Sequence, residues 1–224
     1  MYEPFDETAA RVLLAVNPGD SIRTVAQHLH TPYETVRQAV NQLEDTGYLR
    51  YDDGLFVTDD RIRKAARDLL ATSAAVNPPS IEEAYVLPQF GDWPFAFTQV
   101  DAVYVWTQGG YQVGRDPDDY PLFLAVLEED VDAWQRFFER FGIPTRFERR
   151  PEDSFEGPHQ VVLDERSVLD PDHVEGYPVI SRRETIAFMR EHYATFQSAL
   201  AMLNRMYDDL DLDVSYRESE REWS

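Results

Sequence analysis

Potential metal ligands gather most densely at residues 170–175. Asp170, Asp172, His173 and Glu175 place three carboxylates and one imidazole in a short segment, and both groups are common ligands of divalent metal ions. A single histidine among loop acids is, however, more typical of a solvated segment of an acidic chain than of a metal site. We therefore predict neither a metal site nor a bound cofactor.

No sequence motif of a common catalytic centre is present. The chain lacks the phosphate-binding P-loop, the dinucleotide-binding GxGxxG pattern, the nucleophile elbow GxSxG and the zinc-binding HExxH pattern. It contains no cysteine, which excludes thiolate catalysis, disulfides and thiolate zinc sites. We predict no catalytic residues and no enzymatic activity.

The charge of the chain bears on its binding partners. Asp and Glu number 42 against 21 Lys and Arg, for a net charge of −21, and the sole lysine is Lys64. This composition is similar to that of proteins from salt-loving archaea, whose surface carboxylates hold hydrated cations; an acidic protein of a low-salt organism is the alternative. Counterion release contributes little in molar salt, so the missing basic patch does not exclude a nucleic-acid partner.

Composition also limits the class of protein. The chain of 224 residues is 43% hydrophobic and 13% aromatic, which is enough for a core in one larger or two smaller domains. No apolar run approaches the roughly 18 residues of a membrane span. The first residues, MYEPFDETAA, lack the cationic region of a secretory signal. We expect a soluble cytoplasmic protein without a membrane partner.

The first third of the chain has the pattern of helices followed by a hairpin. Apolar spacing predicts helices over residues 8–16, 22–29, 32–45 and 59–73. Thr31 and Glu34 have the spacing of a capping box at the start of the third helix, and Gly47 is a typical residue after its end. Alternating residues on both sides of Asp52-Asp53-Gly54 predict a hairpin over residues 48–58.

This stretch, SIRTVAQHLHTPYETVRQAVNQLEDTGYLRYDDGLFVTDD, resembles the DNA-binding domain of MarR-like and ArsR-like transcriptional regulators. The matching positions are Ile22, Val25, Ala26, Leu29, Thr35, Val36, Val40, Leu43, Gly47, Tyr48 and Leu49. The resemblance implies a winged helix-turn-helix domain in residues 1–75 and double-stranded DNA as the partner. A winged helix that mediates protein contacts is the alternative.

The same resemblance places the helix over residues 32–45 in the major groove. The DNA-binding residues that it implies are Arg23, Thr31, Tyr33, Glu34, Arg37, Gln38, Asn41, Gln42 and Arg50. Gln38 and Asn41 can bond bidentately to adenine, and Arg37 can reach guanine or phosphate. Arg23 and Arg50 would contact phosphates. The acidic Glu34 and Asp45 on this face weaken the case for tight contact with the DNA backbone.

A second domain is expected over residues 80–224, after the break at Pro78-Pro79. Residues rich in β-branched and aromatic side chains predict strands over 96–106, 121–127, 145–149 and 160–163, with a helix over 130–141. This alternation is typical of an α/β domain. The whole chain is therefore expected to be α+β, with a winged helix followed by a small α/β domain that ends in a long helix.

A second resemblance concerns the segment GGYQVGRDPDDYPLFLAV, which is similar to the strand-turn-strand core of minimal nucleotidyltransferases. The two metal-binding acids of that family fall on Pro121 and Phe123, neither of which can coordinate magnesium. We interpret Asp116, Asp118 and Asp119 as solvated turn residues. The resemblance implies a catalytically dead domain.

The last informative segment has apolar residues at alternating spacings of three and four, which predicts a helix from about 183 to 212. The residues at these spacings are Ile186, Met189, Tyr193, Phe196, Leu200, Leu203, Tyr207 and Leu210. They can form a homodimer seam, or the helix can pack within its own domain.

These observations favour a homodimeric, sequence-specific DNA-binding transcriptional regulator. We expect its C-terminal domain to serve ligand sensing or assembly and to receive a small-molecule or protein effector. The alternative is an antitoxin-like or protein-interaction module, in which the dead nucleotidyltransferase-like domain binds a partner protein.

Overall fold

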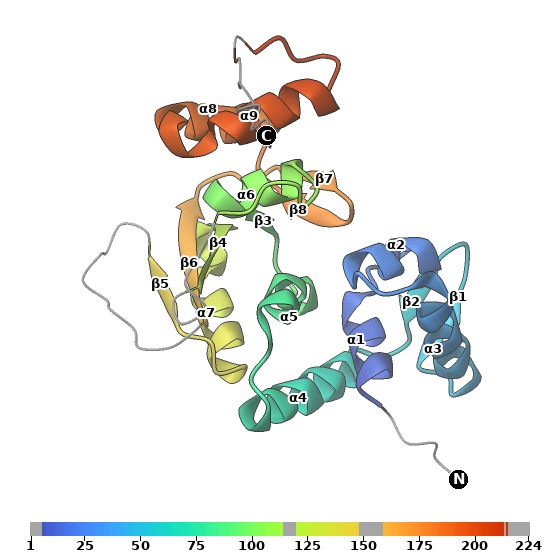
Figure 1. Ribbon diagram of the computed structural model, residues 1–224. Helices are drawn as coiled ribbons and strands as arrows, with labels where there is room; N and C mark the ends of the chain where they lie inside the picture. The colour runs from blue at the N-terminus through green and yellow to red at the C-terminus, as the bar shows by residue number, and fades with distance from the viewer. Residues whose placement is uncertain (1–5, 114–119, 148–158, 213, 215–224) are drawn as a thin grey trace, which may run out of the picture. The chain divides into compact units, whose positions relative to one another are not determined.

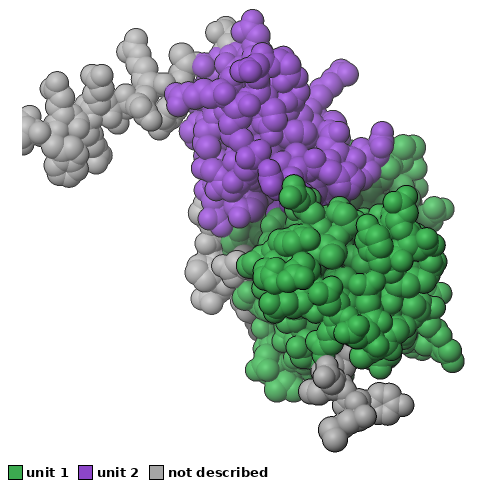
Figure 2. Space-filling view, turned by 90° about the vertical axis from the view of Figure 1, so that its right-hand side faces the viewer, with its two compact units in different colours: residues 1–95, 116–169 green, residues 96–115, 170–224 purple. Residues whose placement is uncertain are grey.

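The computed structural model describes residues 6–113, 120–147, 159–212 and 214. The elements in these ranges form an α+β protein, which confirms the predicted class. The chain divides into two compact units, shown in different colours in Figure 2: residues 1–95 with 116–169 (unit 1), and residues 96–115 with 170–224 (unit 2). The predicted domain boundary at residues 75–80 lies inside unit 1, and the division into domains of residues 1–75 and 80–224 stays a prediction.

The first part of unit 1 contains four helices and a two-stranded hairpin, labelled in Figure 1. They are α1 (Glu7–Ala15), α2 (Ile22–His28), α3 (Tyr33–Asp45), β1 (Leu49–Tyr51), β2 (Leu55–Val57) and α4 (Asp60–Val76). The two strands pair antiparallel, with Arg50 opposite Phe56. These elements confirm the helices and hairpin expected from apolar spacing and turn residues.

Helix starts in this region follow from short polar side chains, with one exception. The Asp6 carboxylate accepts a hydrogen bond from Ala9 N at 2.7 Å, and the Ser21 hydroxyl caps α2 through Thr24 N at 3.1 Å. The predicted capping box at Thr31 is wrong. Pro32 occupies the N-cap of α3 without a side-chain cap, and the Thr31 hydroxyl donates instead to Leu29 O at 3.1 Å.

The apolar face of α3 is buried as its spacing predicts. Val36, Val40 and Leu43 are almost fully inaccessible to solvent, and α3 contacts both α1 and α2. A hydrogen bond of 3.0 Å from Gly19 N to Leu55 O connects the hairpin to the turn before α2. Gly54 at the hairpin turn has a φ of 151°, and a Cβ there would lie 2.5 Å from Gly19 O. Only glycine fits so close an approach of two backbones.

In the second part of unit 1, the described residues form short helices and three parallel strands. Its elements are α5 (Ile81–Val86), η1 (Leu87–Phe90), β4 (Tyr120–Leu127), η2 (Glu128–Asp130), α7 (Val131–Arg140), β5 (Thr145–Phe147) and β6 (His159–Arg166). Strand β6 pairs in parallel with both β4 and β5. Trp134 of α7 is fully buried and contacts the rings of Phe95, Phe137 and Phe138. Burial of such an aromatic side chain contributes roughly 1.5–3 kcal/mol.

The described residues of unit 2 form three helices and short strands. Its elements are α6 (Gln99–Trp106), β7 (Asp172–Val174), β8 (Tyr177–Val179), α8 (Arg182–Glu191) and α9 (Tyr193–Met206). Strand β3 (Phe95–Phe97) reaches into the unit, where Phe97 pairs in parallel with Val179. The indole of Trp106 donates to Ile180 O at 2.9 Å and ties α6 to the end of β8.

The strand predicted over residues 96–106 is wrong over most of its length. Only its first two residues belong to β3, and residues 99–106 form α6. Ala102, Val103, Val105 and Trp106 are all buried, so this helix has no polar face to give it a period of 3.6. Apolar composition alone cannot distinguish a buried helix from a strand. The strand-turn-strand arrangement taken from minimal nucleotidyltransferases is therefore not found here.

The other predicted elements of the C-terminal half agree better with the structure. The strand over 121–127 and the helix over 130–141 correspond to β4 and α7. Strand β6 extends beyond the predicted 160–163, and β5 covers the start of 145–149, of which the last two residues lie outside the described residues.

The structure has two helices, α8 and α9, where one long helix was predicted from 183 to 212, and His192 separates them. Five of the eight residues at the predicted spacings are buried within unit 2: Ile186, Met189, Phe196, Leu200 and Leu203. Tyr193 is 43% exposed, and Tyr207 and Leu210 are partly buried. This burial favours packing within the unit over a dimer seam, and the homodimer itself stays a prediction.

Candidate nucleic-acid interface

Six of the nine residues predicted to bind DNA lie on α3: Tyr33, Glu34, Arg37, Gln38, Asn41 and Gln42. Arg23 lies on α2, Thr31 in the turn before α3, and Arg50 on β1. Gln38 and Asn41 are exposed, opposite the buried face of the helix. The structure thus presents the two amide side chains to solvent on one helical surface.

Glu34 contacts side chains of α3 instead of forming the predicted capping box. Its carboxylate accepts hydrogen bonds from Arg37 Nε at 2.9 Å and Arg37 Nη2 at 2.5 Å, and from Gln38 Nε2 at 3.3 Å. These hydrogen bonds hold the pKa of Glu34 below its usual value and raise the pKa of Arg37. One carboxylate therefore holds two of the side chains that were expected to contact bases.

The hairpin carries a second ordered arginine. Arg50 Nη1 lies 3.0 Å from the Asp52 carboxylate, and its guanidinium carbon is 4.5 Å from the ring centre of Phe56 on the opposite strand. Tyr51 beside it is 62% exposed, and Tyr33 at the start of α3 is 50% exposed. Tyr51 was not among the predicted site residues, although a large aromatic side chain next to Arg50 could have indicated it.

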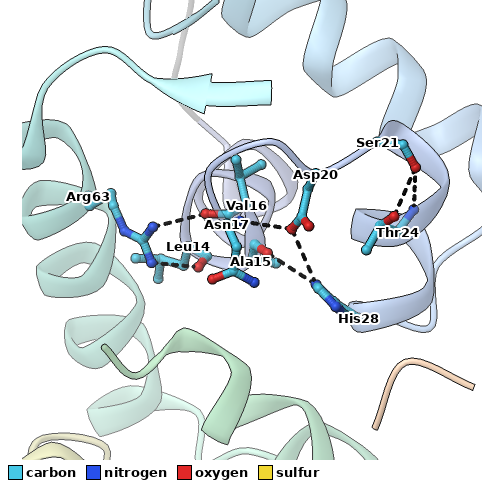
Figure 3. Close-up of polar contacts among 9 residues, drawn as sticks. All are labelled: Leu14, Ala15, Val16, Asn17, Asp20, Ser21, Thr24, His28 and Arg63. Carbon is cyan, nitrogen blue, oxygen red and sulfur yellow. Dashed lines mark hydrogen bonds and ion pairs between the residues drawn. The ribbon is translucent and has the colours of Figure 1, made fainter. Parts of the chain in front are cut away.

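Arg63 of α4 fixes the C-terminal end of α1 (Figure 3). Its Nη1 donates to Val16 O at 2.9 Å and its Nη2 to Leu14 O at 3.0 Å. These carbonyls belong to the last turn of α1 and to its C-cap residue, Val16, where backbone acceptors have no partner in the helix itself. The side chain of Arg63 is mostly buried. This contact positions α1, against which the buried face of α3 packs.

His28 connects α2 to the same end of α1 from the other side (Figure 3). Its Nδ1 lies 3.3 Å from Ala15 O and 3.7 Å from the Asp20 carboxylate. Asp20 also accepts a hydrogen bond from Asn17 N at 2.8 Å.

His30 lies in the turn that leads to α3. Its pKa is lowered to about 4 by partial burial and by the charge of His28.

The electrostatic character of α3 is acidic. The helix carries Glu34, Glu44 and Asp45 against Arg37, so three acids and one base give a net charge of −2. Helix α4 differs, since Arg61, Arg63, Lys64 and Arg67 outnumber Asp60 and Asp68 and give a net charge of +2. The net charge of α3 would therefore repel a polyanion, and the chemistry that its exposed surface offers consists mainly of hydrogen-bonding groups.

Other candidate sites offer less chemistry. In the described ranges, no group of three or more histidine, aspartate or glutamate side chains is arranged to hold a metal ion. Asp116, Asp118 and Asp119 lie outside those ranges. Pro121 and Phe123 lie on β4, opposite Gln160 and Val162. A cavity of about 70 Å³ in unit 1, lined mainly by residues of α1, α4 and η1, is too small for an effector molecule. A larger hollow of about 730 Å³, lined by residues of α7, β5 and the turn between them, lies within the size range of small-molecule sites.

Within the part of the chain that the structure describes, no helix combines the length and apolarity required to cross a bilayer. Comparison with known proteins found no matching family model, curated protein or solved structure.

Proposed function

We propose that this chain is a sequence-specific DNA-binding transcriptional regulator that reads duplex DNA with α3. The observation that carries the proposal is the division of α3 into two faces. Val36, Val40 and Leu43 are buried, while Gln38 and Asn41 are exposed. Amide side chains of this kind can donate to and accept from the major-groove edge of adenine.

The neighbouring elements support this proposal. A short turn joins α2 to α3, and the β1–β2 hairpin follows α3, which is the element order of a winged helix-turn-helix domain. Thirteen residues at about 1.5 Å each give α3 a length of roughly 20 Å, which suits a helix in the major groove. Arg23 on α2 and Arg50 on β1 are exposed and would contact phosphates on either side of the groove.

The acidity of α3 is compatible with this function in a salt-rich cytoplasm. Screening in molar salt weakens repulsion between carboxylates and phosphates as well as attraction to a basic patch. Base-edge hydrogen bonds would then supply more of the affinity. We infer a homodimer that recognises an inverted repeat, since two-fold symmetry in the protein requires two-fold symmetry in the site.

Docking to a partner protein is the second candidate function. Two observations favour it: α3 has a net charge of −2, and the exposed Tyr33 and Tyr51 are of a residue type enriched at protein interfaces. In this case the antitoxin-like or interaction module would use the same surface without reading bases.

Selection from a pool of random duplexes in molar KCl tests the proposal. We expect the parent protein to enrich a defined sequence and the double variant Gln38→Ala/Asn41→Ala to lose selectivity. Each lost bidentate contact removes roughly 1–3 kcal/mol of discrimination against the wrong base. Asn77→Ala, which removes an exposed amide at the end of α4, is the matched control and should select like the parent.

Two outcomes would contradict the proposal. If the parent enriches no sequence, the surface of α3 is better explained as a protein-docking site. If the double variant selects the same duplex as the parent with equal affinity, α3 is not the reading helix.

A further inference from the structure

The guanidinium of Arg37 has two potential targets on a duplex, a guanine edge or a phosphate. The two targets require different properties of the arginine side chain. A phosphate needs a positive charge that can reach the DNA backbone, whereas guanine needs two donors held in the plane of its O6 and N7 atoms. The surroundings of Arg37 distinguish between these demands.

Glu34 contacts one particular edge of the guanidinium. Its two carboxylate oxygens accept from Nε at 2.9 Å and Nη2 at 2.5 Å, a bidentate pair that fixes the plane of the guanidinium. Arginine has five N–H donors in a rigid fork, and this pair engages two of them. The edge formed by the two Nη groups still offers a pair of donors, which can bond bidentately to guanine O6 and N7.

The pair also removes the advantage of a phosphate contact. Arg37 and Glu34 together carry no net charge, and the Glu34 side chain is 57% exposed on the same surface. A phosphate that approached Arg37 would therefore meet a carboxylate as well. Gln38 donates to the same carboxylate at 3.3 Å, so Glu34 fixes two neighbouring reading side chains.

We propose that Glu34 is a positioning residue that directs Arg37 to a guanine base and withholds it from the phosphate backbone. This inference rests on the proposed function and specifies one base that the site reads. Glu34 thereby lowers affinity for DNA of any sequence while it preserves discrimination, which is specificity obtained by disfavouring the wrong target.

The experiment uses the duplex enriched by the full-length parent protein. Each guanine is replaced in turn by 7-deazaguanine, which lacks the N7 acceptor, and Kd is measured by fluorescence anisotropy in molar KCl. The variants are Glu34→Gln and Arg37→Ala. Glu44→Gln is the control, because it makes the same charge change in the last turn of α3. An unrelated duplex measured at several salt concentrations reports non-specific binding.

We expect 7-deazaguanine at one position to weaken binding of the parent about tenfold and to have no effect on Arg37→Ala. In Glu34→Gln the penalty at that position should shrink several-fold. The same variant should bind the unrelated duplex more tightly, with a salt dependence steeper by about one phosphate contact. Glu44→Gln should keep the parent's penalty and salt dependence.

The outcomes separate this inference from the proposed function. A parent that enriches a duplex but tolerates 7-deazaguanine at every position overturns the guanine assignment and leaves DNA reading intact. Equal behaviour of Glu34→Gln and Glu44→Gln overturns the positioning role. A parent that enriches no duplex overturns both.

Discussion

Single side chains around α3 show how local contacts change what a helix can present to a partner. The exposed positions of Gln38 and Asn41 follow from the period of the helix, because Val36 and Val40 must face the core. Glu34 lies on the same surface, but its contacts with Arg37 and Gln38 give it control over both neighbours. A substitution at Glu34 therefore changes the behaviour of three side chains.

His30 provides a prediction that involves pH. Its pKa is lowered from 6.5 to about 4 in the folded chain, so the unfolded chain binds more protons between these values. The free energy of unfolding should therefore fall as pH decreases from 6.5 towards 4. His30→Asn should remove this part of the slope, and asparagine tolerates the left-handed φ of 47° at this position.

The measurement is urea unfolding in molar KCl at a series of pH values, with the variant subtracted from the parent at each value. Titration of the many carboxylates is common to both proteins and cancels in the difference. A difference that stays constant from pH 4 to 7 would falsify the assignment of a lowered pKa to His30.

The contacts of Glu34 differ from those of the predicted capping box. Thr31 and Glu34 have the spacing of a capping box, yet Pro32 occupies the N-cap and the Thr31 hydroxyl donates to Leu29 O. The same glutamate is also three residues from Arg37 and four from Gln38, and these spacings bring side chains together on a helix surface. Spacing alone cannot show which of these alternative contacts Glu34 makes.

At the scale of elements, the position of α3 depends on α1, against which its buried face packs. Arg63 donates to two carbonyls at the C-terminal end of α1, at 2.9 and 3.0 Å. Arg63→Ala removes both hydrogen bonds and leaves partly buried acceptors, at a cost of about 2 kcal/mol in the free energy of unfolding. Urea unfolding in molar KCl, followed by circular dichroism, measures this cost.

Arg61→Ala is the matched control for this prediction. Arg61 lies on the same helix, but its side chain is 90% exposed and pairs with Asp59. Exposed ion pairs contribute roughly 0–1 kcal/mol, so this variant should unfold close to the parent. Equal destabilisation by the two variants would show that the hydrogen bonds from Arg63 to the α1 carbonyls do not stabilise the fold as predicted.

Helices with one buried and one polar face could be predicted, whereas the buried helix α6 could not. Helices α2, α3, α4 and α7 each have a buried and an exposed surface, so their apolar residues recur with the helical period. Helix α6 has no such contrast, because Ala102, Val103 and Val105 face the interior in different directions. The heptad-like spacing from Ile186 onward also continues across the interruption at His192, which spacing does not reveal.

At the scale of the whole molecule, charge is the dominant property, and composition alone is sufficient to predict it. Forty-two acids against 21 bases leave a net charge of −21, and self-repulsion of this size destabilises the compact state. Several arginines are already engaged in ion pairs, such as Arg67 with Asp92 at 2.6 Å. The repulsion that remains must be reduced by cations from the solvent.

The stability of the protein should therefore depend strongly on salt. The Debye length falls from about 10 Å at 0.1 M to about 3 Å at 1 M salt, so repulsion between neighbouring carboxylates is largely screened at the higher concentration. We expect the thermal midpoint, followed by circular dichroism, to be much higher in molar KCl than in dilute KCl. A non-ionic osmolyte at matched osmolality serves as the control and should not reproduce the shift. Equal midpoints in the two KCl solutions would contradict the salt-adapted character of the surface, and the acidic surface of α3 would then weigh against DNA binding.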